Sequence, residues 1–212
     1  MLDNRFKLAL AGLSLSFGLL SCGSVFGPVE QRKVVAYELT DVTISAVPTC
    51  PKTVRNDVIF ISPMRANVPY DSAKMYYAKS PFELNTFGYS QWVANPSDML
   101  TQMITKKIVT SCSFGGIATG NALANADYRL VTQLVTLRQD LTSANTASVK
   151  LVIYVQLVNL EHNKVVAYKI FDEHSPSAVG PEAMVLATNK LVTQFDTEML
   201  EWLQQQTLAT SN

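Results

Sequence analysis

Histidine and cysteine are scarce in this chain, and charge of neither sign predominates. The 212 residues include two histidines and three cysteines, and 17 Lys and Arg balance 17 Asp and Glu. A neutral chain lacks the positive field that draws nucleic acid to a protein, so neither DNA nor RNA is expected as a partner. The scarcity of histidine and cysteine leaves little material for a metal site or for thiol chemistry.

The sequence signatures of common enzymes are also missing. No Gly-x-Ser-x-Gly occurs, so Ser113 and Ser175 lack the sharp turn that presents a catalytic serine. The glycine-rich stretch 115–120 lacks the Gly-Lys-Ser/Thr ending of a phosphate-binding loop. His162 and His174 stand outside any metal motif and are predicted to be solvated loop residues. We therefore expect no catalytic residue, no cofactor, no metal and no enzymatic activity.

The first residues have the layout of a secretory signal peptide. Arg5 and Lys7 precede an uncharged stretch from Leu8 to Leu20. As a helix this stretch would be about 20 Å long, which is short of the hydrocarbon core of a bilayer, about 30 Å thick. A buried core helix is the alternative, but it would have a polar face, and only Ser and Gly interrupt this stretch.

The stretch ends in Leu19-Leu20-Ser21-Cys22, which resembles the bacterial lipobox. The resemblance implies attachment of diacylglycerol to Cys22, removal of residues 1–21, and acylation of the new α-amine with fatty acids such as palmitate. Several acyl chains anchor a protein stably to a membrane, whereas one chain alone does not. Gly23 in place of Asp favours, by resemblance to proteobacterial sorting, the outer membrane over the inner. Residues 22–32 are predicted to form a lipidated tether.

Lipidation of Cys22 leaves Cys50 and Cys112 as a pair in an oxidising compartment. A disulfide between them would close a loop of 62 residues, which stabilises a fold by about 4 kcal/mol in the loop-entropy account. The alternatives are two unpaired, buried thiols or a two-cysteine metal site, and the metal site lacks His or acidic ligands nearby. We predict the disulfide.

The remainder of the chain, residues 33–206, is predicted to be a single α+β domain, followed by a tail over 207–212. Apolar alternation and turn signals predict a mostly antiparallel sheet, and two stretches with helical periodicity predict two main helices on one face of it. Asn95-Pro96 is expected to begin the first helix, with Asn95 as its N-cap, and Gly180-Pro181 to begin the second. The expected strands are 33–39, 57–62, 75–79, 82–93, 128–141, 148–160 and 165–171, and the expected helices run from 96 past 108 and from 181 to about 206.

Aromatic residues are concentrated between Tyr70 and Trp92. Most of them are expected to belong to the core, and a minority to a binding surface. Tyr76 and Tyr77 are neighbours on a predicted strand, so their side chains point to opposite faces. We therefore expect at least one of Tyr76 and Tyr77 to lie on a surface that meets a partner protein or a neighbouring copy.

The order of these residues resembles the ABC-type transport auxiliary lipoprotein family. The likeness covers most of residues 33–206, although Cys50, Cys112 and the segment 41–56 do not match the family pattern. The residues that carry it are Tyr37-Glu38-Leu39, Pro69-Tyr70-Asp71, Met75-Tyr76-Tyr77, Ser80-Pro81, Glu83-Leu84, Phe87, Trp92, Pro96, Met99-Leu100 and Ala126-Asp127-Tyr128-Arg129-Leu130.

The resemblance implies a non-catalytic accessory of an ABC transporter that works with a mammalian-cell-entry (MCE) protein and moves lipid between the inner and outer membranes. The expected partners are the membrane, through the lipid anchor, and an MCE-domain protein in the periplasm, and a homo-oligomer is left open. The absence of a Walker motif agrees with a subunit that does not hydrolyse ATP. Two alternatives are a structural or assembly lipoprotein of the envelope without a transport role and, less favoured, a hydrolase.

Overall fold

The computed structural model describes residues 33–40, 50 and 56–209, and within these ranges residues from Val34 onward form one α+β domain. The predicted signal peptide, Cys22 and the tether lie outside the described residues. Among the described residues, no helix has both the length and the apolar character needed to cross a membrane.

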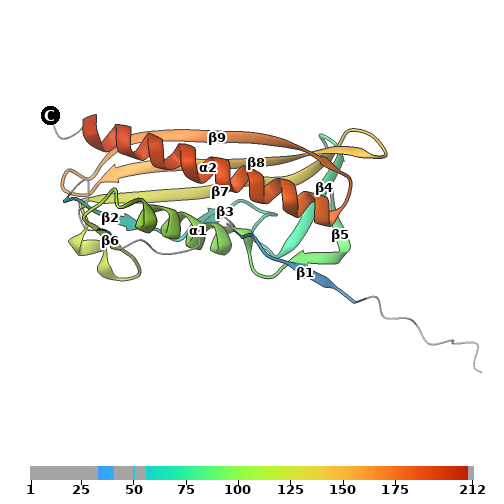
Figure 1. Cartoon of the computed structure of the whole chain (residues 1–212), viewed down its shortest axis with the longest axis horizontal. Coiled ribbons are helices and arrows are strands. Elements are labelled where there is room, and N and C mark those ends of the chain that lie inside the picture. Colours follow the sequence, from blue (N-terminus) through green and yellow to red (C-terminus); the bar gives the residue numbers. More distant parts are fainter. Residues whose placement is uncertain (1–32, 41–49, 51–55, 210–212) are drawn as a thin grey trace, which may run out of the picture. The chain divides into compact units, whose positions relative to one another are not determined.

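Three long strands form the largest part of the sheet (Figure 1). β7 (Tyr128–Leu141), β8 (Thr146–Asn159) and β9 (Lys164–Ala178) pair antiparallel in succession through two short turns. In β8, five apolar residues at alternate positions are buried, because one face of the strand meets the core. These residues are Val149, Leu151, Ile153, Val155 and Leu157.

The second part of the sheet adds the shorter strands on the other side of β7. β4 and β5 form an antiparallel hairpin, and the other short ladders, including the one between β4 and β7, are parallel. Most paired residues are antiparallel because of the three long strands, as predicted. The short strands are β1 (Val35–Tyr37), β2 (Val58–Ile61), β3 (Arg65–Ala66), β4 (Lys74–Ser80), β5 (Glu83–Trp92) and β6 (Gly116–Ala118).

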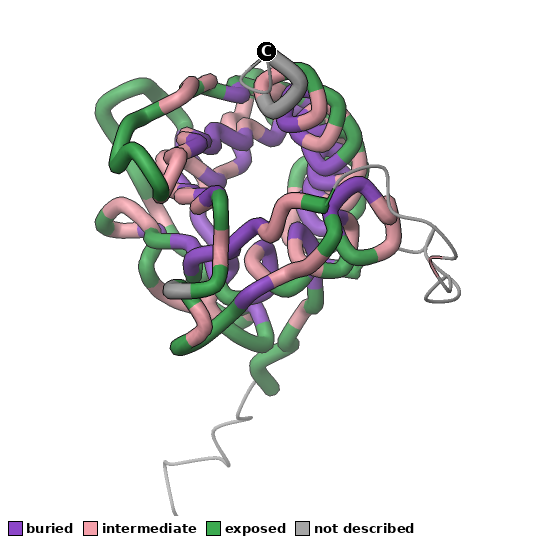
Figure 2. Tube along the Cα trace, turned by 90° about the vertical axis from the view of Figure 1, so that its left-hand side faces the viewer, coloured by how far each residue is buried: buried purple, intermediate pink, exposed green. Residues whose placement is uncertain are grey.

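Two helices, α1 (Pro96–Ser111) and α2 (Pro181–Ala209), lie on the same face of the sheet, as predicted (Figure 1). A short 3-10 helix, η1 (Ala122–Asn125), follows β6. Helical spacing turns one side of α2 to the core, since residues three and four apart share a face. Figure 2 shows buried residues along the inner sides of both helices. On α2 they include the five residues expected from the sequence, Met184, Leu191, Phe195, Met199 and Trp202.

The start of α1 differs in detail from the prediction. The side chain of Asn95 makes no capping hydrogen bond, and its amide lies 3.4 Å from a carboxylate oxygen of Asp71 instead. The backbone carbonyl of Asn95 accepts the amides of Asp98 and Met99. Pro96 occupies the first turn, where its missing N–H costs no helical hydrogen bond.

Strand β9 is longer than the sequence predicted. It continues seven residues beyond Phe171, to Ala178, and pairs there with the first residues of β8. His174 therefore lies within a strand and not in a loop, and it remains exposed beside Asp172. His162 does lie in the turn between β8 and β9, as expected.

Candidate functional site

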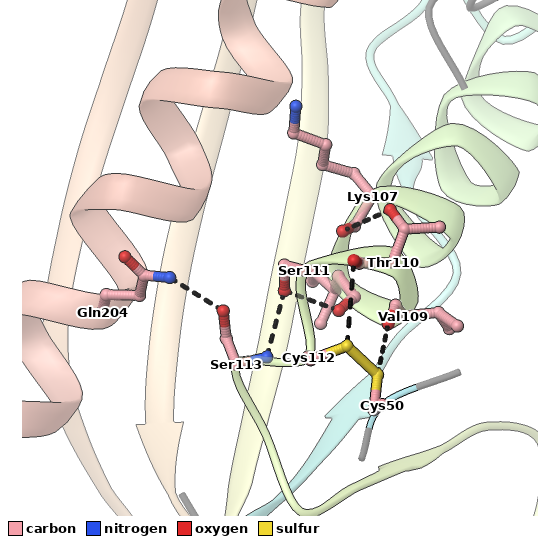
Figure 3. The surroundings of a disulfide bond; sticks show 9 residues. Cys50, Lys107, Val109, Thr110, Ser111, Cys112, Ser113 and Gln204 are labelled. Carbon is pink, nitrogen blue, oxygen red and sulfur yellow. Dashed lines mark hydrogen bonds between the residues drawn. A yellow bond between two sulfur atoms is a disulfide. The ribbon is translucent and has the colours of Figure 1, made fainter. Parts of the chain in front are cut away.

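The two described cysteines are joined in a disulfide at the end of α1 (Figure 3). Their Cα atoms are 5.6 Å apart, within the range that a disulfide spans. Cys112 ends the helix in the left-handed conformation, with φ 54°, and its amide donates to the carbonyl of Val109. The bond attaches Cys50 to the helical layer, so it fastens the chain that precedes β2.

The buried serine beside the disulfide is held by an amide and not by a base. Ser113 is 1% exposed, and its hydroxyl accepts a hydrogen bond of 2.7 Å from the side chain of Gln204 on α2 (Figure 3). A nucleophilic serine needs a histidine or another base within hydrogen-bonding distance. Ser175 is also buried, near the end of β9, where its backbone carbonyl accepts a hydrogen bond from the hydroxyl of Ser148. The hydrogen bond from Gln204 gives Ser113 a structural role, in which it joins the end of α1 to α2.

Polar side chains in the described ranges do not converge into a catalytic or metal-binding cluster. No group of three or more potential ligands forms among these residues. Asp127 accepts the backbone amide of Val58 at 2.7 Å and so joins two parallel strands. Asp172 pairs with Lys150 and lies 3.2 Å from His174, on an exposed part of the sheet.

A close ion pair lies near the end of β7 next to the β4–β5 hairpin. Arg138 donates to Asp140 at 2.7 Å, with about a quarter of the arginine side chain exposed. Burial alone would lower the pKa of Arg138, but the charge and hydrogen bond of Asp140, together with Tyr70, raise it above its ordinary value. Arg138 therefore remains a cation and serves to hold this corner of the sheet.

A groove of about 810 Å³ lies on the face of the sheet that the helices leave uncovered. It runs across β7 and β8 from the end of β2 to the β8–β9 turn. Val131, Tyr154 and Val158 give it an apolar floor, and Arg65 and Arg129 supply positive charge. The described lining residues include no Asp or Glu. Such a surface favours a partner that combines apolar and acidic or polar groups.

Beyond the groove, the same face carries large apolar side chains in solvent. Tyr168 is 68% exposed and Ile170 is 60% exposed, both on β9. The rings of Tyr154 and Tyr168 lie 6.2 Å apart across the two strands. Contiguous exposed apolar surface of this kind is typical of a protein-binding face. The sequence indicates this face only weakly, because the alternation in β8 is incomplete and Tyr154 and Val158 are apolar positions on the side away from the core.

The two tyrosines predicted for an interface have different surroundings. Tyr76 is buried, and its hydroxyl donates to the carbonyl of Pro69 at 3.1 Å, so this residue belongs to the core and not to a surface. Tyr77 is half-buried, and its ring lies 4.8 Å from that of Phe87 on β5. The expectation that at least one of the pair meets a partner therefore rests on Tyr77.

Residues 37–199 match the sequence model of the ABC-type transport auxiliary lipoprotein component. The chain belongs to this family. The match covers β1 to most of α2, which is nearly the whole described domain. The family is described as a lipoprotein component auxiliary to ABC-type transport, in agreement with the sequence-based prediction.

Solved structures share this fold at low sequence identity. Protein XCC0632 from Xanthomonas campestris is 18% identical, with a TM-score of 0.71, over 84% of this chain and 99% of that one. A second, uncharacterised protein is 10% identical, with a TM-score of 0.61, over 81% and 99% of the two chains. No curated protein matches the chain. These likenesses establish the fold.

Proposed function

We propose that this lipoprotein is a non-catalytic component of an ABC/MCE-type system that moves lipid between the inner and outer membranes. In this proposal the acyl chains on Cys22 hold it in the outer membrane, facing the periplasm, and the folded domain binds the MCE-domain protein. The observation that carries the proposal is the family match, which spans the folded domain from β1 to α2.

The arrangement of the described surfaces supports a binding role over a catalytic one. Ser113 and Ser175 have no catalytic base among their described partners. The uncovered face of the sheet presents exposed aromatic and aliphatic side chains beside a groove that carries two arginines. Aromatic residues and arginine are enriched at the centres of protein interfaces. We therefore assign the contact with the MCE-domain protein to this face.

Co-purification from native membranes tests the proposal. The full-length lipoprotein, carrying an affinity tag at its C-terminus, is extracted with a mild detergent, and the recovered proteins are identified by mass spectrometry. An MCE-domain protein is the expected partner. Recovery of envelope assembly factors without any MCE-domain protein would instead favour a structural lipoprotein and would contradict a transport role.

A pair of matched variants tests the assigned face. Ile170→Glu places a charge on the uncovered face of the sheet, whereas Leu186→Glu places one on α2, and the two native residues are 60% and 68% exposed. Because both side chains are already in solvent, neither change should unfold the domain. Loss of the MCE-domain protein with Ile170→Glu alone is expected. Equal recovery with both variants would place the contact elsewhere.

A further inference from the structure

The tip of the β4–β5 hairpin exposes a phenylalanine almost completely. Pro81 and Phe82 form the two-residue turn between paired Ser80 and Glu83, and Phe82 is 99% exposed. The hairpin is part of the main sheet, because β4 also pairs with β7 at Tyr77 and Ala78. The sheet therefore presents a large apolar ring to solvent at a fixed position, where it contributes nothing to the core of this chain.

The same part of the sheet collects further exposed apolar side chains. β1 forms the edge of the sheet beside β5, and Figure 1 shows the two strands together at one end of the domain. An exposed apolar edge strand invites association unless something covers it. The exposed apolar residues of β1, β5 and their flanks are Val34, Val35, Phe82, Leu84, Tyr89 and Val93.

The lipidated tether joins the domain at this edge. β1 runs parallel to β5, with Val35 opposite Ser90 and Tyr37 opposite Trp92. β1 therefore runs in the same direction as β5, away from the hairpin tip, and Val34 at its start is on the side of the tip. The twelve residues 22–33 span at most about 40 Å when fully extended. An anchor at Cys22 thus keeps Val34, where this apolar edge begins, within about 40 Å of the membrane surface.

From this juxtaposition we propose that Phe82 inserts into the lipid bilayer and fixes the orientation of the domain on the membrane. The inference rests on the proposed anchoring at Cys22, and it adds a second contact that sets which side of the domain faces the lipid. Once the acyl chains are inserted, contact of Phe82 with the bilayer is an intramolecular event. The inserted state of the tip is therefore well populated even if the intrinsic affinity of one aromatic ring for lipid is weak. An aromatic ring is suited to the boundary between headgroups and acyl chains.

Charges near the tip are compatible with this contact. Lys79 is exposed two residues before Pro81, where it can lie near anionic headgroups. Glu83 follows Phe82, and its carboxylate accepts a hydrogen bond of 2.7 Å from the amide of Asn85, further along β5. This hydrogen bond holds the carboxylate of Glu83 toward Asn85 and away from the hairpin tip.

A tryptophan reporter tests the insertion. The full-length lipoprotein with Phe82→Trp is reconstituted through its own acyl chains into phosphatidylethanolamine and phosphatidylglycerol vesicles, with or without phosphatidylcholine brominated on its acyl chains. Tyr168→Trp, at a position 68% exposed on β9, is the matched control. Native Trp92 and Trp202 are 1% and 9% exposed, so the unsubstituted protein supplies the background.

The tryptophan at position 82 should lose about half of its fluorescence with brominated lipid, because bromine quenches only groups that reach the acyl chains. The tryptophan at position 168 should be unaffected by bromine and accessible to acrylamide. If the protein floats with the vesicles and position 82 responds only to acrylamide, insertion is overturned while the anchor stands. Shielding of position 82 from both quenchers would show that a second copy covers the tip, which also overturns insertion.

The same samples report on the anchor separately. Flotation with the vesicles and the intact mass of lipidated Cys22 are measured before the fluorescence. A protein that does not float and has an unmodified Cys22 would overturn the anchoring and the insertion that rests on it. Normal flotation with unquenched tryptophan at position 82 would overturn the insertion alone.

Discussion

The side-chain amide of Gln139 donates a hydrogen bond of 2.7 Å to the backbone carbonyl of Ala178. Gln139 is fully buried in β7, and it also donates to the hydroxyl of Ser177 and accepts the amide of Gly180. The side chain of Gln139 thus joins β7 to the end of β9 and to Gly180, the residue that precedes α2. Gly180 has φ 128°, a conformation that favours glycine, so the chain can reverse sharply there.

Replacing Gln139 with leucine should lower the free energy of unfolding by about 1–3 kcal/mol, since leucine cannot make the three hydrogen bonds that the buried amide of Gln139 forms with Ser177, Ala178 and Gly180. Chemical denaturation followed by circular dichroism measures the change. Gln102→Leu is the matched control, because Gln102 is exposed on α1 and its loss should matter by less than about 0.5 kcal/mol. Equal stability of the two variants would show that this amide does not brace the fold.

The sequence indicated the fold class because periodicity reports burial directly. The alternation in β8 and the helical spacing in α2 placed Val149 to Leu157 and Met184 to Trp202 on the core face, where they are buried. The Ser80-Pro81 turn signal located the β4–β5 hairpin in the same way. Patterns of this kind are local, so they need no knowledge of the tertiary structure.

Other features depend on contacts between distant segments and leave no local pattern. The end of β9 contains Pro176 among serines and resembles a loop, yet it is a strand because it pairs with the start of β8. The parallel partners of β2 were not predictable, since register over two to three residues comes from packing. The groove is formed by residues from several strands, and their arrangement depends on the tertiary structure. In the sequence, only the apolar residues Tyr154 and Val158 on the outer face of β8 indicate where it lies.

Gly115 illustrates such a distant contact and makes a separate prediction. Its amide donates to the backbone carbonyl of Asp57 at 2.9 Å, and a Cβ atom added at Gly115 would collide with the backbone of Asn56. Gly115→Ala should therefore destabilise the domain by about 1–3 kcal/mol, because backbone cannot give way as a flexible side chain can. Gly88→Ala is the control, since no atom within 4 Å would meet the added methyl group. Thermal unfolding of both variants measures the difference in stability. A Gly115→Ala variant that is as stable as the unsubstituted protein would contradict the prediction.

The Cys50–Cys112 bond should be intact in protein taken from the periplasmic side of the membrane. Peptide mapping without reduction is expected to recover one linked peptide and no free thiol at either position. Cys50→Ser and Cys112→Ser should each reduce stability, by up to about 4 kcal/mol, and the double variant should be no worse than either. Additive losses, or two free thiols in the mapped protein, would argue against the bond.

Lipidation is predicted to depend entirely on Cys22, because Cys22 is the cysteine that ends the lipobox-like Leu19-Leu20-Ser21-Cys22, whereas Cys50 and Cys112 lie beyond it and pair with each other. Cys22→Ala should accumulate as an uncleaved precursor and disappear from the outer-membrane fraction. Cell fractionation and intact mass of the product measure both effects. Cys50→Ser is the control, and it should be processed and sorted normally. A Cys22→Ala protein that matures at residue 22 would refute the anchor.

Tyr77 is predicted to contribute to the contact with the MCE-domain protein or with a neighbouring copy, and Tyr76 is its natural comparison. Tyr77 is half-buried, and its ring packs against Phe87 on the adjacent strand. Part of the Tyr77 side chain is therefore accessible to a partner, and the ring does not fill the core. Tyr77→Ala should weaken association by about 1–3 kcal/mol and leave the Tm nearly unchanged. Tyr76→Ala should lower the Tm instead, since that ring is buried and its hydroxyl bonds to Pro69.

Binding by full-length protein in detergent, with the melting temperature measured on the same samples, separates the two effects. A Tyr77→Ala variant that unfolds at lower temperature but binds normally once folded would assign the ring to packing alone. The comparison is decisive because the two residues are adjacent on β4, so a general disturbance of the strand would affect both variants alike. Only an interface role predicts loss of binding at Tyr77 without loss of stability.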